Sequence, residues 1–179
     1  MTYKEIDGDL IKLALQGEFD VIAHGCNCYC IMGAGIAVEM KNTFECNTFP
    51  LEDMEYKGDV NKLGQIDYDT FTLSKHDLGE TKLFSHSKVR NQFKQWTDLK
   101  TFSVVNAYTQ CRYGTSGGAP VDYEAITLCM RKMNYIFAGK HIGLPKIGCG
   151  LAGGNWDIIK EIIQEELQNC DVTIVNYKK

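Results

Sequence analysis

The sequence has no excess of positive charge. Its 179 residues include 19 Lys and Arg against 23 Asp and Glu, which gives a formal net charge of -4 at pH 7. A broad nucleic-acid-binding surface depends on clustered Lys and Arg, so this balance argues against one. Anionic ligands are still allowed, because backbone N–H groups and helix N-termini bind phosphate without net positive charge.

Long apolar runs are also missing. No segment approaches the roughly 20 apolar residues that span a bilayer, so we expect no membrane partner. Residues 1–16 lack a basic region followed by an apolar one, and we expect them to begin the fold rather than to form a signal peptide. The 8 cysteines then indicate free thiols in a reducing compartment, and a cytoplasmic protein.

Internal repeats and low-complexity segments are absent, and the length favours a single domain over residues 1–179. Strand and helix patterns alternate at both ends of the chain. The predicted strands are residues 3–6, 20–25, 64–74, 81–89, 101–110, 141–148 and 171–177, and the predicted helices are 8–15, 33–44, 121–139 and 155–169, with a short one within 45–63. This order predicts an α/β fold with a mixed, mostly parallel sheet and helices on both faces.

Three glycine-rich loops follow predicted strands, at residues 25–35, 111–118 and 148–154. Ligands of such sheets bind at the loops that leave the carboxyl ends of strands. In "MGAGIA" (32–37) the loop opens a helix, whose free N–H groups and dipole favour an anion. "IGCGLAGGNW" (147–156) repeats this arrangement. Either loop alone could be a tight turn, whereas the pair favours binding of a diphosphate.

Cys26, Cys28 and Cys30 alternate, so an extended backbone would place them on one face. A structural zinc site normally uses paired Cys knuckles with a second ligand pair, and the redox motif C-x-x-C is absent. We therefore interpret these residues as small buried thiols, and expect no metal and no cofactor.

His24 and Asn27 end the second predicted strand, beside the first glycine loop. A histidine there can act as a general acid or base, or orient a phosphate. The alternative, which the residues alone favour, is a partly buried histidine bonded to backbone. Asn27 can bond a pair of sugar hydroxyls, or it can stabilise its own turn.

Four segments resemble macrodomains, the ADP-ribose-binding fold, in their order and spacing. They are "GDL" (8–10), "HGCNC…MGAGIA" (24–37), "NAYTQ" (106–110) and "LPKIGCGLAGG" (144–154). The resemblance spans essentially the whole chain and implies a three-layer α/β macrodomain. Within the family, the sequence is most similar to the ADP-ribose-1''-phosphate phosphatase branch, which carries an H-x-C-N-C segment like residues 24–28.

The resemblance implies that the partner is ADP-ribose or ADP-ribose-1''-phosphate. Asp9 and Leu10 would contact adenine, as would Asn176 and Tyr177 at the end of the last strand, and Asn27 would bond the distal ribose. The loop residues implied to hold the diphosphate and distal ribose are Met32, Gly33, Ala34, Gly35 and Ile36, and Gly148, Cys149, Gly150, Leu151, Ala152, Gly153 and Gly154. His24 and Asn27 would be catalytic, with His24 serving as acid, base or nucleophile.

One departure from the family is informative. The neighbouring glycohydrolase branch uses a lysine at the end of the central strand and an aspartate in the second glycine loop. Gln110 and Ala152 occupy those positions here, which puts that covalent mechanism in doubt. The expected function is therefore phosphate removal from ADP-ribose-1''-phosphate. The alternatives are a non-catalytic module for ADP-ribose or a signalling nucleotide, and an ADP-ribosyl hydrolase.

The sequence of residues 70–100 mixes histidines, basic residues and aromatic residues, and we expect it to form a solvated hairpin and a helix. It does not identify a protein partner.

Overall fold

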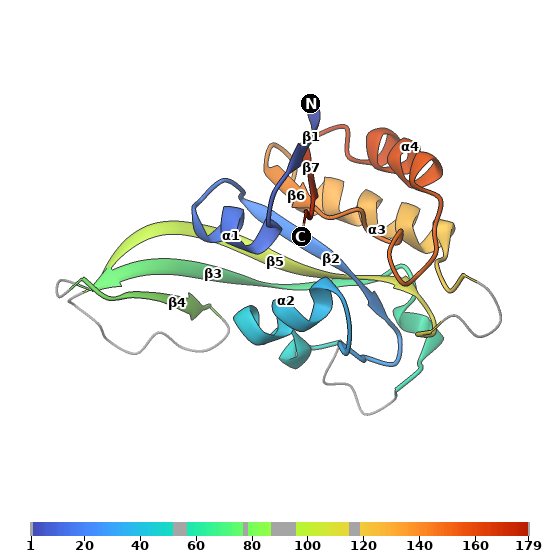
Figure 1. Ribbon diagram of the computed structural model, residues 1–179, viewed down its shortest axis with the longest axis horizontal. Helices are drawn as coiled ribbons and strands as arrows, with labels where there is room; N and C mark the ends of the chain where they lie inside the picture. The colour runs from blue at the N-terminus through green and yellow to red at the C-terminus, as the bar shows by residue number, and fades with distance from the viewer. Residues whose placement is uncertain (1, 52–56, 77–78, 87–95, 115–118, 179) are drawn as a thin grey trace.

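A computed structural model describes residues 2–51, 57–76, 79–86, 96–114 and 119–178. Within these residues, one seven-stranded sheet has the order β1-β7-β6-β2-β5-β3-β4 (Figure 1). The strands are β1 (Tyr3–Asp7), β2 (Val21–Asn27), β3 (Ile66–His76), β4 (Thr81–Ser85), β5 (Trp96–Gln110), β6 (His141–Leu144) and β7 (Asp171–Asn176). The helices are α1 (Leu10–Leu15), α2 (Ile36–Phe44), α3 (Tyr123–Ile136) and α4 (Trp156–Glu166), with 3-10 turns η1 (Cys46–Thr48) and η2 (Val60–Lys62).

The sheet is parallel from β1 through β7, β6 and β2 to β5. β3 then pairs antiparallel with β5, and β4 antiparallel with β3. These two strands and β5 extend together as a long ribbon at one side of the molecule (Figure 1). The predicted mixed, mostly parallel sheet is confirmed.

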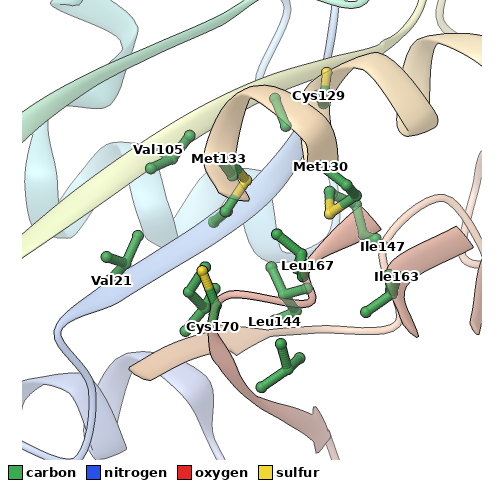
Figure 2. Packing of buried hydrophobic residues seen from close by; sticks show 14 of the residues in the cluster. Val21, Val105, Cys129, Met130, Met133, Leu144, Ile147, Ile163, Leu167 and Cys170 are labelled. Atoms are coloured by element: carbon green, nitrogen blue, oxygen red, sulfur yellow. The ribbon is translucent and has the colours of Figure 1, made fainter. Parts of the chain in front are cut away.

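Two hydrophobic cores lie on the two faces of the sheet, as the alternation along β2 shows. Val21 and Ala23 belong to the core that contains Met133 of α3 and Ile163 of α4, part of which Figure 2 shows. Ile22 belongs to the other core, beneath α1 and α2. Successive side chains of a strand point to opposite faces, so β2 supplies both cores. Helices therefore cover both faces, and the structure has three layers.

Predicted and observed elements differ mainly at their ends. β5 begins at Trp96, five residues before the predicted strand. The reason is that its antiparallel pairing with β3 continues as far as His76 and Trp96. The short helix predicted within 45–63 is wrong for the described residues, which form η1 and η2. The helix predicted within 70–100 would fall on residues 87–95, outside the described part. In that part, no helix combines the length and apolar character of a membrane span.

Two helix starts follow the sequence closely. Asp9 caps α1 by accepting a hydrogen bond from the Lys12 amide, and Asn155 caps α4 by accepting one from the Asp157 amide. Both residue types satisfy otherwise unpaired N–H groups of a first turn. These helix starts and the carboxyl ends of the parallel strands lie at the same edge of the sheet, where the glycine loops meet.

Candidate functional site

A groove of two joined pockets runs along the carboxyl edge of the parallel strands. The first, the β2–β5 pocket, has a volume of about 500 Å³ and lies over the ends of these two strands. It is lined by Gly25, Asn27, Ile31, Gly33, Ala34, Gly35, Ile36, Ala37, Thr109, Gln110, Tyr113, Gly114, Pro145, Lys146, Ile147, Gly148, Gly150, Leu151 and Ala152.

The second, the β1–β7 pocket, has a volume of about 870 Å³ and lies over the ends of β1 and β7, which are neighbours at one edge of the sheet. It is lined by Asp7, Asp9, Leu10, Ile11, Gly35, Ile36, Glu39, Pro145, Lys146, Cys149, Gly150, Val175, Asn176, Tyr177 and Lys178. Gly35, Ile36, Pro145, Lys146 and Gly150 line both pockets. Both volumes are in the range of small-molecule sites.

The first glycine loop forms one wall of the groove. Gly35 begins α2 with φ +61° and no side-chain cap, a conformation that an L-residue rarely adopts. The first-turn N–H groups of Ile36 and Ala37 have no partner within the helix. Both residues line the β2–β5 pocket, so the wall can accept an anion as predicted. Met32 is the exception, because its side chain is buried in the α1–α2 core with the Cys46 thiol 3.6 Å from its sulfur.

The second glycine loop also lines the groove, except for its last two residues. Gly148 through Ala152 contribute to one pocket or the other. Gly153 and Gly154 line neither pocket. The Gly154 amide donates to the Gly148 carbonyl at 2.8 Å, and a Cβ on Gly154 would lie 2.7 Å from that oxygen. The predicted ligand contacts of this pair are therefore not supported; they close the turn before α4.

His24 lies outside the groove. Its side chain is fully buried, and its Nε2 is 2.8 Å from Asn106 Oδ1. The Asn106 amide nitrogen donates to the Cys46 carbonyl at 2.9 Å, so Oδ1 faces the ring and Nε2 carries the proton. Burial lowers the pKa of His24 to about 4, against the opposing effect of the Asn106 bond.

The alternation of β2 explains this placement. Gly25 and Asn27 line the groove, whereas His24 points to the opposite face, where the Cys26 and Cys46 thiols lie 3.7 Å and 3.6 Å from its Nε2. The structure therefore gives no support to the predicted catalytic role of His24. The buried alternative describes its position, although its partner is a side chain rather than a backbone carbonyl.

Asn27 does line the β2–β5 pocket, but its amide is engaged with its own turn. Its Nδ2 donates to the Ile31 carbonyl at 2.9 Å, and its Oδ1 accepts from the Ile31 amide at 3.3 Å. The side chain thus braces the start of the first glycine loop. β2 ends at this residue, so the extended backbone that would place the three alternating cysteines on one face includes only Cys26. Cys26 and Cys28 are buried, as interpreted, whereas Cys30 is partly exposed.

The four residues predicted to contact a base all line the β1–β7 pocket. Asp9 Oδ1 accepts from the Lys12 amide at 3.1 Å, and its Oδ2 is 3.6 Å from the Lys12 ammonium. Leu10 is buried beside it, and the ring of Tyr177 is exposed at the pocket's end. This pocket also holds the acceptors Asp7 and Glu39.

Sequence reasoning missed two polar residues of the groove, Lys146 and Thr109, whereas the resemblance had placed Asn176 next to Tyr177 at the adenine. Lys146 lines both pockets, with its ammonium 5.4 Å from the centre of the Trp156 ring. Thr109 Oγ1 and Asn176 Oδ1 are buried and have no hydrogen-bond partner among the described residues. For Thr109, the position at the end of β5 was the available clue. In the described part of the chain, no cluster of His, Cys, Asp and Glu is arranged to hold a metal ion.

No protein-family model matches the sequence. A curated relative from Enterobacteria phage T4, an uncharacterized 17.5 kDa protein in the tk-vs intergenic region, is 30% identical over 183 residues. The match covers 99% of this chain and 98% of the phage protein. The chain belongs to the family of that phage protein.

Solved structures show which fold this phage-protein family has. The macrodomain of Thermus aquaticus DarG superposes with a TM-score of 0.57 and 17% identity, covering 99% of both chains. A Trypanosoma brucei macrodomain in complex with ADP-ribose superposes with a TM-score of 0.56 and 11% identity, covering 99% of this chain and 64% of that one. This member of the phage-protein family therefore has the macrodomain fold, as the sequence resemblance implied.

Proposed function

We propose that this protein binds ADP-ribose along the groove, with adenine in the β1–β7 pocket and the terminal ribose in the β2–β5 pocket. The observation that carries the proposal is the distribution of polar groups along the groove. Acceptors gather at one end, a cation and free backbone N–H groups lie at the junction, and uncharged polar side chains lie at the other end. The Trypanosoma brucei macrodomain that superposes on this chain contains ADP-ribose, which supports the same assignment.

The β1–β7 pocket suits a base with an exocyclic amine. Asp9 and the unpartnered Asn176 Oδ1 both accept hydrogen bonds, and adenine offers an amino group to such acceptors. Tyr177 presents an exposed ring at the same end, on which a base can stack.

The junction of the pockets suits a diphosphate. Lys146 supplies positive charge to both pockets, and the first turn of α2 supplies N–H groups beside Gly35. A helix N-terminus and a lysine each favour negative charge. A diphosphate placed here would leave the β2–β5 pocket for a neutral sugar, since Asp and Glu are absent from its lining in the described residues.

Phosphate removal from ADP-ribose-1''-phosphate has weaker support than binding. The catalyst proposed for it, His24, is buried on the opposite face of β2. An ADP-ribosyl hydrolase that works through a lysine and an aspartate has weaker support too, since Gln110 and Ala152 line the pocket at those positions. We therefore propose a binding module as the function that this site supports best.

Calorimetric titration with ADP-ribose tests the proposal. Asp9→Asn keeps the helix cap but replaces an acceptor by an amide, and we expect at least a roughly tenfold loss of affinity. Asp59→Asn is the matched control, because Asp59 also caps a turn, with its Oδ1 2.9 Å from the Asn61 amide, but lines neither pocket. Absence of ADP-ribose binding by the wild-type protein would refute the proposal.

The same samples distinguish binding from catalysis. A binding module leaves ADP-ribose-1''-phosphate intact, so no phosphate is released above the rate without protein. Steady phosphate release by the wild-type protein would overturn the choice of a binding module, and its persistence in Asn27→Ala would show that the chemistry does not depend on that amide.

A further inference from the structure

Thr109 occupies an irregular position in β5, directly at the floor of the groove. The register of β2 and β5 pairs Cys26 with Tyr108 and Asn27 with Gln110, so Thr109 is an extra residue opposite that step. Such β-bulges re-aim side chains and are frequent beside binding sites. The Thr109 carbonyl accepts a hydrogen bond from the Asp122 amide at 3.0 Å, whereas its hydroxyl has no partner among the described residues.

The Thr109 hydroxyl is buried and unpaired, and a glycine keeps the space beside it open. The residue is fully buried yet lines the β2–β5 pocket, and Oγ1 has no hydrogen-bond partner among the described residues. A Cβ on Gly25, which lines the same pocket, would lie 2.9 Å from this oxygen and 3.3 Å from Ile147 Cγ1. Any side chain at position 25 would therefore cover the hydroxyl.

We propose that Thr109 is a specificity-determining residue, whose hydroxyl bonds a sugar hydroxyl of the ligand in the β2–β5 pocket. This inference rests on the proposed function, and it names the side chain that recognises the terminal ribose. A hydroxyl both donates and accepts, which matches another hydroxyl. Apart from Lys146 at the junction of the two pockets, the polar side chains of this pocket, Asn27, Gln110 and Tyr113, are uncharged as well, which favours a neutral sugar over a phosphate at this point.

An unpaired buried hydroxyl also has a cost in the free protein. Leaving a buried polar group without a partner is unfavourable, while replacing it by an apolar group of the same shape is close to neutral or stabilising. Thr109→Val is nearly the same shape. A residue kept for ligand recognition should therefore lose affinity on this change without losing stability, whereas a residue with a structural hydrogen bond should lose stability.

The experiment compares wild type, Thr109→Val and Thr109→Ser in calorimetric titrations with ADP-ribose and with ADP, which lacks the terminal ribose. Thr109→Val should bind ADP-ribose roughly three- to tenfold more weakly, the effect of one neutral hydrogen bond, with unchanged affinity for ADP. Thr109→Ser should retain most of the ADP-ribose affinity. The melting temperature of ligand-free Thr109→Val should equal or exceed that of wild type.

Each other outcome is decisive. Wild-type protein that does not bind ADP-ribose refutes the proposed function itself. If wild type binds and Thr109→Val binds ADP-ribose equally well, the assignment of Thr109 is wrong. Equal weakening toward ADP and ADP-ribose, or a lower melting temperature of ligand-free Thr109→Val, would mean that Thr109 shapes the groove or holds the fold instead of contacting the sugar.

Discussion

The buried neutral His24 should make the protein sensitive to mild acid. Burial lowers the pKa of this ring from 6.5 to about 4, whereas the unfolded chain has the ordinary value. Between these two values the unfolded state binds a proton that the folded state does not, so stability falls as the pH drops from 6.5 toward 4. Below the folded pKa both states are protonated, and the loss stops growing.

The magnitude follows from the size of the shift. One pKa unit is worth about 1.4 kcal/mol, so the full change from 6.5 to about 4 lowers the free energy of unfolding by about 3 kcal/mol. Roughly 2 kcal/mol of this is already lost between pH 7 and pH 5. Glu5, Asp20 and Asp171 also have lowered pKa values. Their contribution to stability is lost only at lower pH, once the pH falls below the pKa that these carboxyl groups have in the unfolded chain.

Urea unfolding followed by circular dichroism at pH 7 and pH 5 measures the loss directly. His24→Gln, which can still donate to Asn106, should remove most of the difference between the two pH values. His141→Gln is the control, because this ring bonds the Thr173 hydroxyl of β7 instead of Asn106, and its variant should keep the wild-type difference. Equal wild-type stability at both pH values, or an NMR titration of His24 near pH 6.5, would refute the reasoning.

Three further substitutions probe the second glycine loop and the groove beside it. Gly154→Ala places a methyl group 2.7 Å from the Gly148 carbonyl oxygen and 2.8 Å from Ile159 Cδ1, and should lower the free energy of unfolding by about 1–3 kcal/mol. Gly150→Ala, where a Cβ meets nothing within 4 Å, should leave thermal stability unchanged, and equal melting temperatures for the two variants would contradict the packing. Lys146→Met should weaken ADP-ribose binding and flatten its dependence on salt concentration; an unchanged salt dependence in titrations would show that Lys146 does not contact the diphosphate.

The sheet and its helices could be predicted because periodicity is a local property of the sequence. The helices predicted at 8–15, 121–139 and 155–169 became α1, α3 and α4, and residue types that favour helix starts, Asp9 and Asn155, cap the first and the last of these. The short helix expected within 45–63 failed because the described residues there leave only single turns. Tertiary pairing, which no local pattern contains, extended β5 outward to Trp96.

The candidate site was predicted better in its loops than in its chemistry. Glycine loops after strands identified both walls of the groove. His24 was misplaced as a catalyst because nearness along the chain was taken for nearness in space. Side chains alternate along β2, so Gly25 and Asn27 line the groove while His24 points to the opposite face. Thr109 was missed for a different reason: its orientation depends on a bulge that appears only when β2 and β5 pair.

The sheet order makes the two ends of the described chain neighbours in space. β1 pairs with β7, with Tyr3 beside Val172 and Asp7 beside Asn176, so closing this edge joins segments more than a hundred and sixty residues apart. Contacts of such long sequence separation are slow to form, and β1 is an edge strand held by a single neighbour. A ligand that lies across both pockets would contact both this edge and the middle of the sheet, and would stabilise the pairing of β1 with β7. Occupancy of the groove and order at the ends of the chain would then rise and fall together.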